Sequence, residues 1–255
     1  MLDADPPETH SAALERLVAI MARLRDPVSG CEWDRVQTFA SIAPYTIEEA
    51  YEVSDAIARD DMASLVDELG DLALQVVFHA RIAEEAGKFD LVEVLTGICA
   101  KLERRHPHIF GDAELGGHHL SEAIKAEERQ SHPDRSALAG VALALPALER
   151  AAKLQKRAAR TGFDWPDIEG PKTKILEELD EIACAPPEMV EEEVGDLLFA
   201  VVNFARHLKV DPEEALRKAN RKFERRFRTI EATPDFTTLS LDQQEALWLL
   251  AKRGG

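Results

Sequence analysis

The sequence contains few aromatic residues, few cysteines and no long apolar run. Phe, Trp and Tyr make up 6% of its 255 residues, and no alternating β-branched segments between hairpin turns occur, which argues against a sheet protein. The three cysteines, at positions 31, 99 and 184, are far apart and form no C-x-x-C pair, as in proteins of a reducing cytoplasm. The apolar run within 138–148 is too short to span a bilayer, and the first ten residues lack the pattern of an export signal. We therefore expect a cytoplasmic protein that does not enter a membrane.

Basic residues are also scarce relative to acidic ones. The chain has 31 Lys and Arg against 48 Asp and Glu, with a formal net charge of −17. Nucleic-acid backbones are bound by clustered cations, so this balance argues against nucleic acid as a partner. The sequence also lacks a P-loop, a G-x-G-x-x-G turn and an evident Ser-His-Asp or Cys-His arrangement. Walker-type phosphate binding and nucleophilic catalysis therefore have no support.

Helical periodicity dominates the sequence. Between residues 13 and 24, Leu14, Leu17, Val18 and Met21 recur at the spacing of one buried helical stripe. We expect an all-α fold with short connections between antiparallel helices. Similar stripes predict further helices at roughly 44–58, 62–86, 90–105, 146–160, 172–184, 188–208, 212–230 and 241–252.

Several motifs occur twice, in the same order. EEAYE, DELGD and KLERR in the first half are matched by EELDE, EEVGD and KFERR in the second, and GCEWD is matched by GFDWP. This repetition predicts two related helical bundles in tandem. Between them lies a stretch rich in Gly, His, Ser and Pro, which is typical of a linker. We predict domains at 1–111 and 141–255, joined by a linker at 112–140 that contains a short helix.

The repeated acidic motifs predict two clusters of carboxylates. Residues three or four positions apart share a helix face, and E-x-x-D lies among apolar residues at core spacing in both halves. An isolated E-x-x-E is usually a solvated surface, but carboxylates beside a core are costly unless they are paired or bind a metal. Oxygen ligands favour Mg²⁺, with Mn²⁺ as a substitute. The predicted ligands are Glu178, Glu181, Glu193 and Asp196, and in the first repeat Glu49, Glu52, Glu68 and Asp71.

Cations accompany the acidic motifs of the second half. Lys174 lies one turn before Glu178, and KFERR contributes Lys222, Arg225 and Arg226. Magnesium held by carboxylates commonly fills its remaining coordination positions with substrate phosphates and water. Lys and Arg side chains near such a site would bind the rest of the phosphate chain. The alternative is that these cations only neutralise neighbouring acids on the same helices. We favour a site for a metal-chelated phosphate ester.

The motifs in both halves resemble the two-domain MazG nucleoside triphosphate pyrophosphohydrolases. The resemblance runs from about residue 14 to residue 248 and includes DELGDLALQVVFHA, TGFDWPDIEGP, EEEVGDLLFAVVNFARHL and KANRKFERRF. It implies an all-α helical bundle that forms a homodimer. It also implies Mg²⁺-dependent cleavage of nucleoside triphosphates to monophosphate and pyrophosphate with broad base tolerance, in the house-cleaning or regulation of nucleotide pools.

The resemblance also implies roles for individual residues. The second repeat would carry the main activity, with the metal ligands named above and with Lys174, Lys222, Arg225 and Arg226 on the polyphosphate. Trp248 lies where the family has a tryptophan that contacts nucleotide, although a lone Trp near a terminus is more often a packing residue. As a mechanism we expect water to attack the α-phosphorus, with Glu177 or Glu178 as proton acceptor and Lys174 stabilising the leaving pyrophosphate. The first repeat keeps its acidic set, and its activity is left open.

Two other functions remain as alternatives. A di-iron carboxylate bundle needs E-x-x-H on two helices, and the sequence has one match, Glu103 and His106, which is more typical of a helix end beside Pro107. A regulatory dimer that binds nucleotides without hydrolysing them is the second, although two full acidic sets argue against a complete loss of chemistry. The GGHH histidines have no metal-ligand spacing and are interpreted as loop residues.

Overall fold

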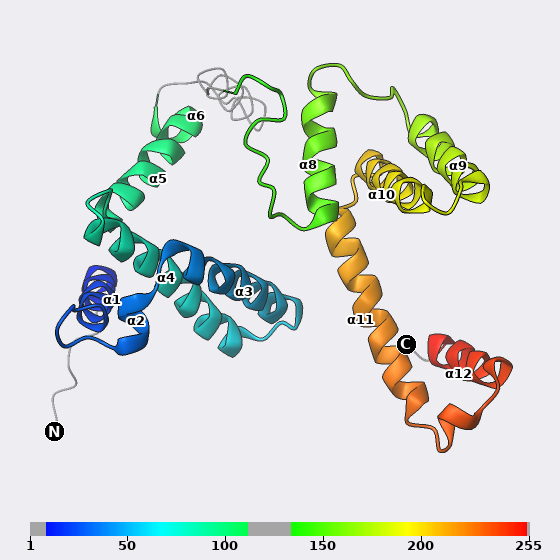
Figure 1. The fold of residues 1–255 in the computed structure, drawn as a ribbon, viewed down its shortest axis with the longest axis horizontal. Coiled ribbons are helices and arrows are strands. Elements are labelled where there is room, and N and C mark those ends of the chain that lie inside the picture. The colour runs from blue at the N-terminus through cyan, green and yellow to red at the C-terminus, as the bar shows by residue number, and fades with distance from the viewer. Residues whose placement is uncertain (1–8, 112–133, 254–255) are drawn as a thin grey trace. The chain divides into compact units, whose positions relative to one another are not determined.

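The computed structural model describes residues 9–111 and 134–253 of the chain (Figure 1). Within these ranges the regular elements are all helices and no strand occurs, which confirms the all-α prediction. The chain divides into two compact units, Met1–Ala126 and Glu127–Gly255. The short helix predicted in the linker falls at 121–130 and the GGHH histidines at 116–119, so both lie outside the described residues.

The first unit is built around α4 (Met62–Glu85), on which α1 (His10–Leu24), α3 (Phe39–Ala58) and α5 (Leu91–Arg105) all pack. Two short helices complete it, α2 (Glu32–Val36) and α6 (Pro107–Phe110). The most extensive packing in this unit is between α3 and α4, which carry the two acidic motifs of this repeat. Their packing brings EEAYE and DELGD onto neighbouring helices.

The second unit repeats this plan around α10 (Val190–His207). The helices α8 (Ala147–Ala159) and α9 (Glu169–Cys184) pack on α10, and α11 (Pro212–Glu231) contacts both α8 and α10. A 3-10 turn, η1 (Phe236–Thr238), and α12 (Leu241–Arg253) then pack on α11. The order α1, α3, α4, α5 thus recurs as α8, α9, α10, α11, as the repeated motifs predict.

Side-chain caps mark the starts of several described helices, and the start of α3 differs most from the prediction. Asp61, Asp90 and Asp211 cap the first turns of α4, α5 and α11 by accepting backbone N–H groups. In contrast, α3 begins at Phe39 rather than near 44, because Thr38 forms a capping box with Ser41 ahead of Pro44. Pro44 therefore lies inside the first turns of the helix.

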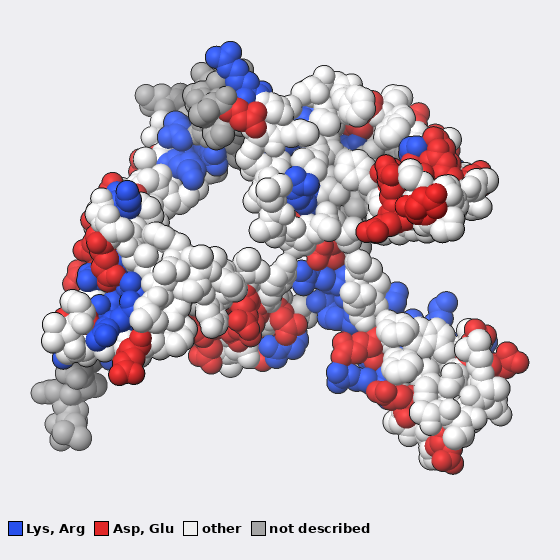
Figure 2. Space-filling view, viewed as in Figure 1, with Lys and Arg blue, Asp and Glu red and all other residues white. Residues whose placement is uncertain are grey.

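Charge is unevenly distributed over each unit. Figure 2 shows acidic side chains gathered over α3 and α4 in the first unit and over α9 and α10 in the second, where cationic atoms lie among them. Among the helices that the structure describes, none is both long enough and apolar enough to cross a membrane. The acidic faces are thus the main feature of the surface to explain.

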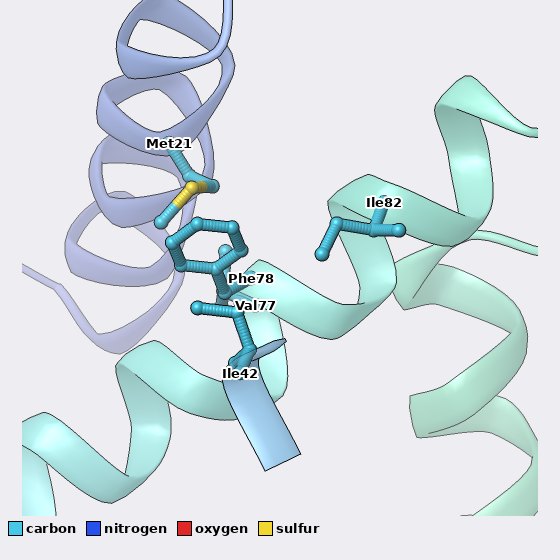
Figure 3. Close-up of a cluster of buried hydrophobic side chains, with 5 residues drawn as sticks. All are labelled: Met21, Ile42, Val77, Phe78 and Ile82. Carbon is cyan, nitrogen blue, oxygen red and sulfur yellow. The ribbon is translucent and has the colours of Figure 1, made fainter. Parts of the chain in front are cut away.

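The first unit has a continuous apolar core between α1, α3 and α4. Met21, Ile42, Val77 and Phe78 are at most 4% exposed, and Ile82 completes the cluster (Figure 3). Burying each such side chain contributes about 1.5–3 kcal/mol to folding. Phe78 is central to this cluster, and its ring is nearly perpendicular to that of Trp33, with ring centroids 6.4 Å apart.

Candidate metal centre and adjoining cavity

The second unit brings three of the predicted ligands together. Glu178 on α9 and Glu193 and Asp196 on α10 each offer one carboxylate oxygen, and these oxygens all lie within 4.8 Å of one another. The spacing of three residues places Glu193 and Asp196 on one face of α10, and the packing of α9 on α10 supplies Glu178. Three converging carboxylate oxygens are a suitable ligand set for a hard divalent cation.

Glu178 provides the best test of whether these residues fit a cation. The residue is 2% exposed, its Oε1 lies 2.5 Å from the Lys174 ammonium, and its Oε2 is buried with no hydrogen-bond partner in the described structure. A buried carboxylate oxygen left without a partner is destabilising. A cation beside Oε2 would remove that cost, so the residues present fit a divalent metal.

Lys174 is the cation at the centre of the acidic face of α9. Its ammonium group lies 2.8 Å from Glu177, 2.5 Å from Glu178 and 3.9 Å from Glu181. Hydrogen bonds to Glu177 and then Glu178 hold the pKa of Lys174 above its usual value, so the side chain stays charged. Desolvation raises the pKa of Glu181, although the positive charge of Lys174 acts in the opposite direction. Glu181 is not part of the three-oxygen group, and its role as a fourth ligand remains a prediction.

The first unit contains a similar group without the lysine. One oxygen each from Glu49, Glu52 and Glu68 lies within 4.8 Å of the others. Burial first, and then repulsion from Asp71 and Glu52, raises the pKa of Glu49, and burial and the same neighbours raise the pKa of Glu68. Asp71 is thus close to the group but is not a member of it. Tyr45 precedes Glu49 by four residues, where Lys174 precedes Glu178 by four.

A cavity of about 690 Å³ adjoins the carboxylates of the second unit. Lys174, Glu178 and Asp196 form part of its wall, and much of the rest is apolar, including Trp165 and Phe199. The indole of Trp165 lies directly against the backbone of α9 at Gly170. A Cβ at this position would be only 2.1 Å from the indole Cδ1, so the close packing needs a glycine. The volume is in the range of small-molecule sites.

A charged network forms another part of the cavity wall. Arg206 donates two hydrogen bonds to Asp164, at 2.5 and 2.9 Å, and two to Asn203 Oδ1, at 2.6 and 3.0 Å. His207 Nε2 lies 3.0 Å from the same Asp164 carboxylate. The bonds from Arg206, together with His207, lower the pKa of Asp164 to about 2. Asp164 is therefore ionised at neutral pH and holds Arg206 in place.

The cavity residues Gln155, Asp164, Trp165, Asn203 and Arg206 were not predicted as site residues. Asp164 and Trp165 lie in GFDWP, which the repeat analysis singled out without assigning a role. Asn203 and Arg206 follow Phe199 by four and seven residues, so a one-face spacing on α10 was available as a signal. Nothing in the sequence indicates that Asp164 pairs with Arg206, because they are far apart in the chain.

The other predicted phosphate- and base-binding residues lie elsewhere. Lys222, Arg225, Arg226 and Trp248 are not among the described residues that line the cavity. Trp248 on α12 packs against Phe223 on α11, with ring centroids 5.2 Å apart. The nucleotide-binding roles of these four predicted residues remain predictions. The rival di-iron motif has no support from the geometry. His106 directly follows α5, with its Nδ1 2.8 Å from the Leu102 carbonyl oxygen, and neither His106 nor Glu103 belongs to a ligand group in the described chain.

Comparisons with known proteins agree with this arrangement. Residues 37–110 and 172–230 match the family model described as the MazG nucleotide pyrophosphohydrolase domain. A nucleoside triphosphate pyrophosphohydrolase of Escherichia coli (strain K12) is 50% identical, and the match covers 94% of this chain and 97% of that protein. A Thermotoga maritima protein named nucleoside triphosphate pyrophosphohydrolase/pyrophosphatase MazG is 46% identical, with 94% and 96% covered. A nucleoside triphosphate pyrophosphohydrolase of Mycobacterium tuberculosis is 31% identical, with 78% and 65% covered.

Proposed function

Because the chain belongs to the MazG nucleotide pyrophosphohydrolase family, we propose that it hydrolyses nucleoside triphosphates to nucleoside monophosphate and pyrophosphate, with Mg²⁺ as cofactor and with broad tolerance of the base. The observation that carries this proposal is the buried Glu178 carboxylate, which faces Glu193 and Asp196 beside a cavity of nucleotide size. The 46–50% identity to named pyrophosphohydrolases supports hydrolysis of a phosphoric anhydride bond.

Glu178, Glu193 and Asp196 would hold the cation, with Glu181 as a further ligand. When bound, Mg²⁺ supplies Lewis-acid chemistry at phosphate oxygens and makes water a better nucleophile. The remaining roles fall to the chain itself. The Lys174 ammonium, which stays charged, stabilises the negative charge that builds on the leaving pyrophosphate.

The proton of the attacking water needs an acceptor near the carboxylates. Glu178 already accepts Lys174 at Oε1 and belongs to the ligand group, whereas Glu177 is half exposed and bonds to Lys174 through Oε1. We assign the general base to Glu177. The water oxygen forms a bond to the α-phosphorus, its proton passes to Glu177, and the bond from the α-phosphorus to the bridging oxygen breaks to release pyrophosphate.

Hydrolysis in ¹⁸O-labelled water tests the position of attack. We expect the label in the monophosphate, because water attacks the α-phosphorus. Label in pyrophosphate would instead place the attack at the β-phosphorus, and orthophosphate with nucleoside diphosphate would overturn the reaction class. Nucleotide binding with no turnover in Mg²⁺ or Mn²⁺ would favour the regulatory alternative.

Variants test the assignment of roles. Glu193→Gln and Asp196→Asn should abolish Mg²⁺-dependent turnover, and Glu177→Gln should lower kcat by about 10²-fold or more while Mg²⁺ affinity is kept. Glu231→Gln, an exposed carboxylate at the end of α11, removes one charge from the same unit and should have no effect. Full activity of Glu193→Gln would show that the catalytic site is not in the second unit.

We also propose a homodimer as the assembly. Apolar side chains on α11 and α12 remain exposed, including Phe223, Leu249 and Leu250, each more than half exposed. Such side chains are more typical of an interface when they gather on adjacent helices. Light scattering should give twice the chain mass of 28.3 kDa, and a mass of one chain at micromolar concentration would contradict the dimer.

A further inference from the structure

In the first unit, the indole of Trp33 is in contact with two other aromatic rings. The ring centroid of Tyr45 lies 6.0 Å from that of Trp33, and the centroid of Phe78 lies 6.4 Å from it, with the ring planes inclined by 76° and 86°. Phe78 is only 3% exposed and belongs to the apolar core of this unit. The space beside the indole is therefore filled by rings of the chain itself.

The second unit keeps the tryptophan but not the two rings. Trp165 in GFDWP corresponds to the tryptophan of GCEWD. Lys174 takes the place of Tyr45, four residues before the first clustered glutamate, and Asn203 takes the place of Phe78, seven residues after the motif Asp. Trp165, Lys174 and Asn203 all line the cavity of about 690 Å³. The cavity thus corresponds to the place where the first unit packs its two rings.

The aromatic side chains of this cavity have no ring partner of their own. The ring pairs in the described part of the second unit all lie on α11, η1 and α12. Trp165 is held in place by its loop, since its backbone N–H donates to the Asp164 carboxylate at 3.0 Å and Arg206 holds that carboxylate. Phe163 lines the same cavity and is 81% exposed. Aromatic rings held in place beside an open volume are typical of a ligand site.

The chemistry of the cavity suits a flat ring that is joined to a phosphate chain. The first unit shows that an aromatic ring fits beside the corresponding indole. Lys174, Glu178 and Asp196 supply the cation and the carboxylates of the same cavity wall, which suit phosphates and a metal. Contact between a base and an aromatic side chain is tolerant of sequence, because every base has a π-face.

We propose that the nucleobase of the substrate occupies the place that the Phe78 ring fills in the first unit, in contact with Trp165 and Phe163, and that it is recognised as a flat ring rather than through its hydrogen-bonding edge. The inference rests on the proposed function and deepens it. It makes Asn203 a specificity-determining residue, because a large side chain at this position would close the base site. It also gives broad base tolerance a physical cause, since purines and pyrimidines share the aromatic face.

Two triphosphates that differ from ATP only in the base test the proposal. Indole riboside triphosphate keeps a flat bicyclic ring but lacks the hydrogen-bonding edge of adenine, and its kcat/KM with the wild-type enzyme should lie within about threefold of that of ATP. The triphosphate of 1-deoxyribose has no base. Its kcat/KM should be roughly tenfold or more below that of ATP, since stacking of one base on an aromatic side chain contributes about that factor.

Variants locate the contact. Phe163→Ala and Trp165→Ala should each reduce the advantage of ATP over the base-free triphosphate by about fivefold or more, while turnover of the base-free compound is kept. Phe163 is so exposed that its removal should hardly affect folding. Asn203→Phe, which introduces the ring of the first unit, should remove the advantage of ATP. The matched control Trp33→Ala, in the first unit, should leave the ratio of the two substrates at its wild-type value.

The outcomes separate this inference from the proposed function. If the wild-type enzyme hydrolyses ATP and the base-free triphosphate equally well, no base is bound in the cavity, although the pyrophosphohydrolase assignment stands. An indole compound as poor as the base-free one would show that the edge of the base is read, and would overturn the inference. A reduced ratio in Trp248→Ala but not in Phe163→Ala or Trp165→Ala would place the base on α12 instead. If no triphosphate is hydrolysed in Mg²⁺, the proposed function itself fails.

Discussion

Replacing Lys174 with methionine should destabilise the second unit, because it removes the cation from a buried carboxylate. Lys174 lies 2.5 Å from Glu178, whose side chain is 3% exposed, while Lys174 itself is 35% exposed. Breaking a fully buried ion pair by removing one partner costs about 3–5 kcal/mol. The partial exposure of Lys174 reduces that cost by solvent screening, and we expect a loss of about 2 kcal/mol in metal-free buffer.

The same helix offers a matched control. Lys172 pairs with Glu169 at 3.0 Å, but both side chains are more than half exposed. Exposed pairs of this kind contribute at most about 0.5 kcal/mol. Lys172→Met should therefore leave the melting temperature nearly unchanged, whereas Lys174→Met should lower it by roughly 5 °C or more.

Magnesium distinguishes a metal centre from an ordinary ion pair. Calorimetry or a dye-based melt is run on each variant in EDTA and in excess Mg²⁺, which stabilises a site by about 2.7 kcal/mol at 100 times its Kd. The gap between Lys174→Met and wild type should narrow in Mg²⁺, because the ion supplies the missing positive charge. Adding Glu178→Gln should recover part of the loss in EDTA. Equal effects of the two lysine variants, or a gap that Mg²⁺ does not change, would refute the reasoning.

Three further predictions concern the charges of both units. Asp164→Asn should weaken the dependence of the free energy of unfolding on acidic pH, measured by urea unfolding at several pH values. The pKa of Asp164 is lowered from 3.8 to about 2, so the stabilisation from its pairing with Arg206 is complete above the pKa of the unfolded state and is lost as the pH falls through about 2. An unchanged profile would contradict that pairing. Glu49→Gln should slow hydrogen exchange in the first unit in EDTA but not in Mg²⁺, since burial and neighbouring carboxylates raise the pKa of Glu49 and make its charge costly; faster exchange in EDTA argues against it. Finally, Glu193→Gln should lower turnover at least about 100-fold and Glu68→Gln less than about twofold, because the described cavity adjoins the second cluster; comparable losses would show that both repeats turn over.

In each unit the structure brings together three of the four carboxylates that the sequence placed in a cluster, because local rules determine most of their positions. A spacing of three or four residues fixes which carboxylates share a helix face, and core-spaced neighbours show that E-x-x-D lies at a helix contact. The selection of Glu178, Glu193 and Asp196 as the oxygens that converge needed the packing of α9 on α10. Burial of Glu178 could not be read from the pattern, because Glu177 and Glu181 beside it have the same residue type and are exposed.

The cavity could not be predicted by such rules. Its wall depends on contacts between segments far apart in the chain, such as Arg206 with Asp164 and Gln155 with the Phe199 carbonyl. Periodicity indicates that a position is buried but not whether the space beside it is filled. Trp248 illustrates the same limit, since its contact with Phe223 depends on how α12 folds back onto α11.

The two repeats show how one scaffold separates packing from binding. Phe78 follows Asp71 by seven residues in the first unit, and Asn203 follows Asp196 by seven in the second. At this position the first unit buries a ring against Met21 and Ile42, which contributes about 1.5–3 kcal/mol. The second unit instead buries the Asn203 amide, which Arg206 holds, and leaves an open volume beside it. Neither the amide nor the open volume supplies the stabilisation that the buried ring gives the first unit. A ligand that fills the volume would restore part of it, so binding should be coupled to the stability of the second unit more strongly than to that of the first.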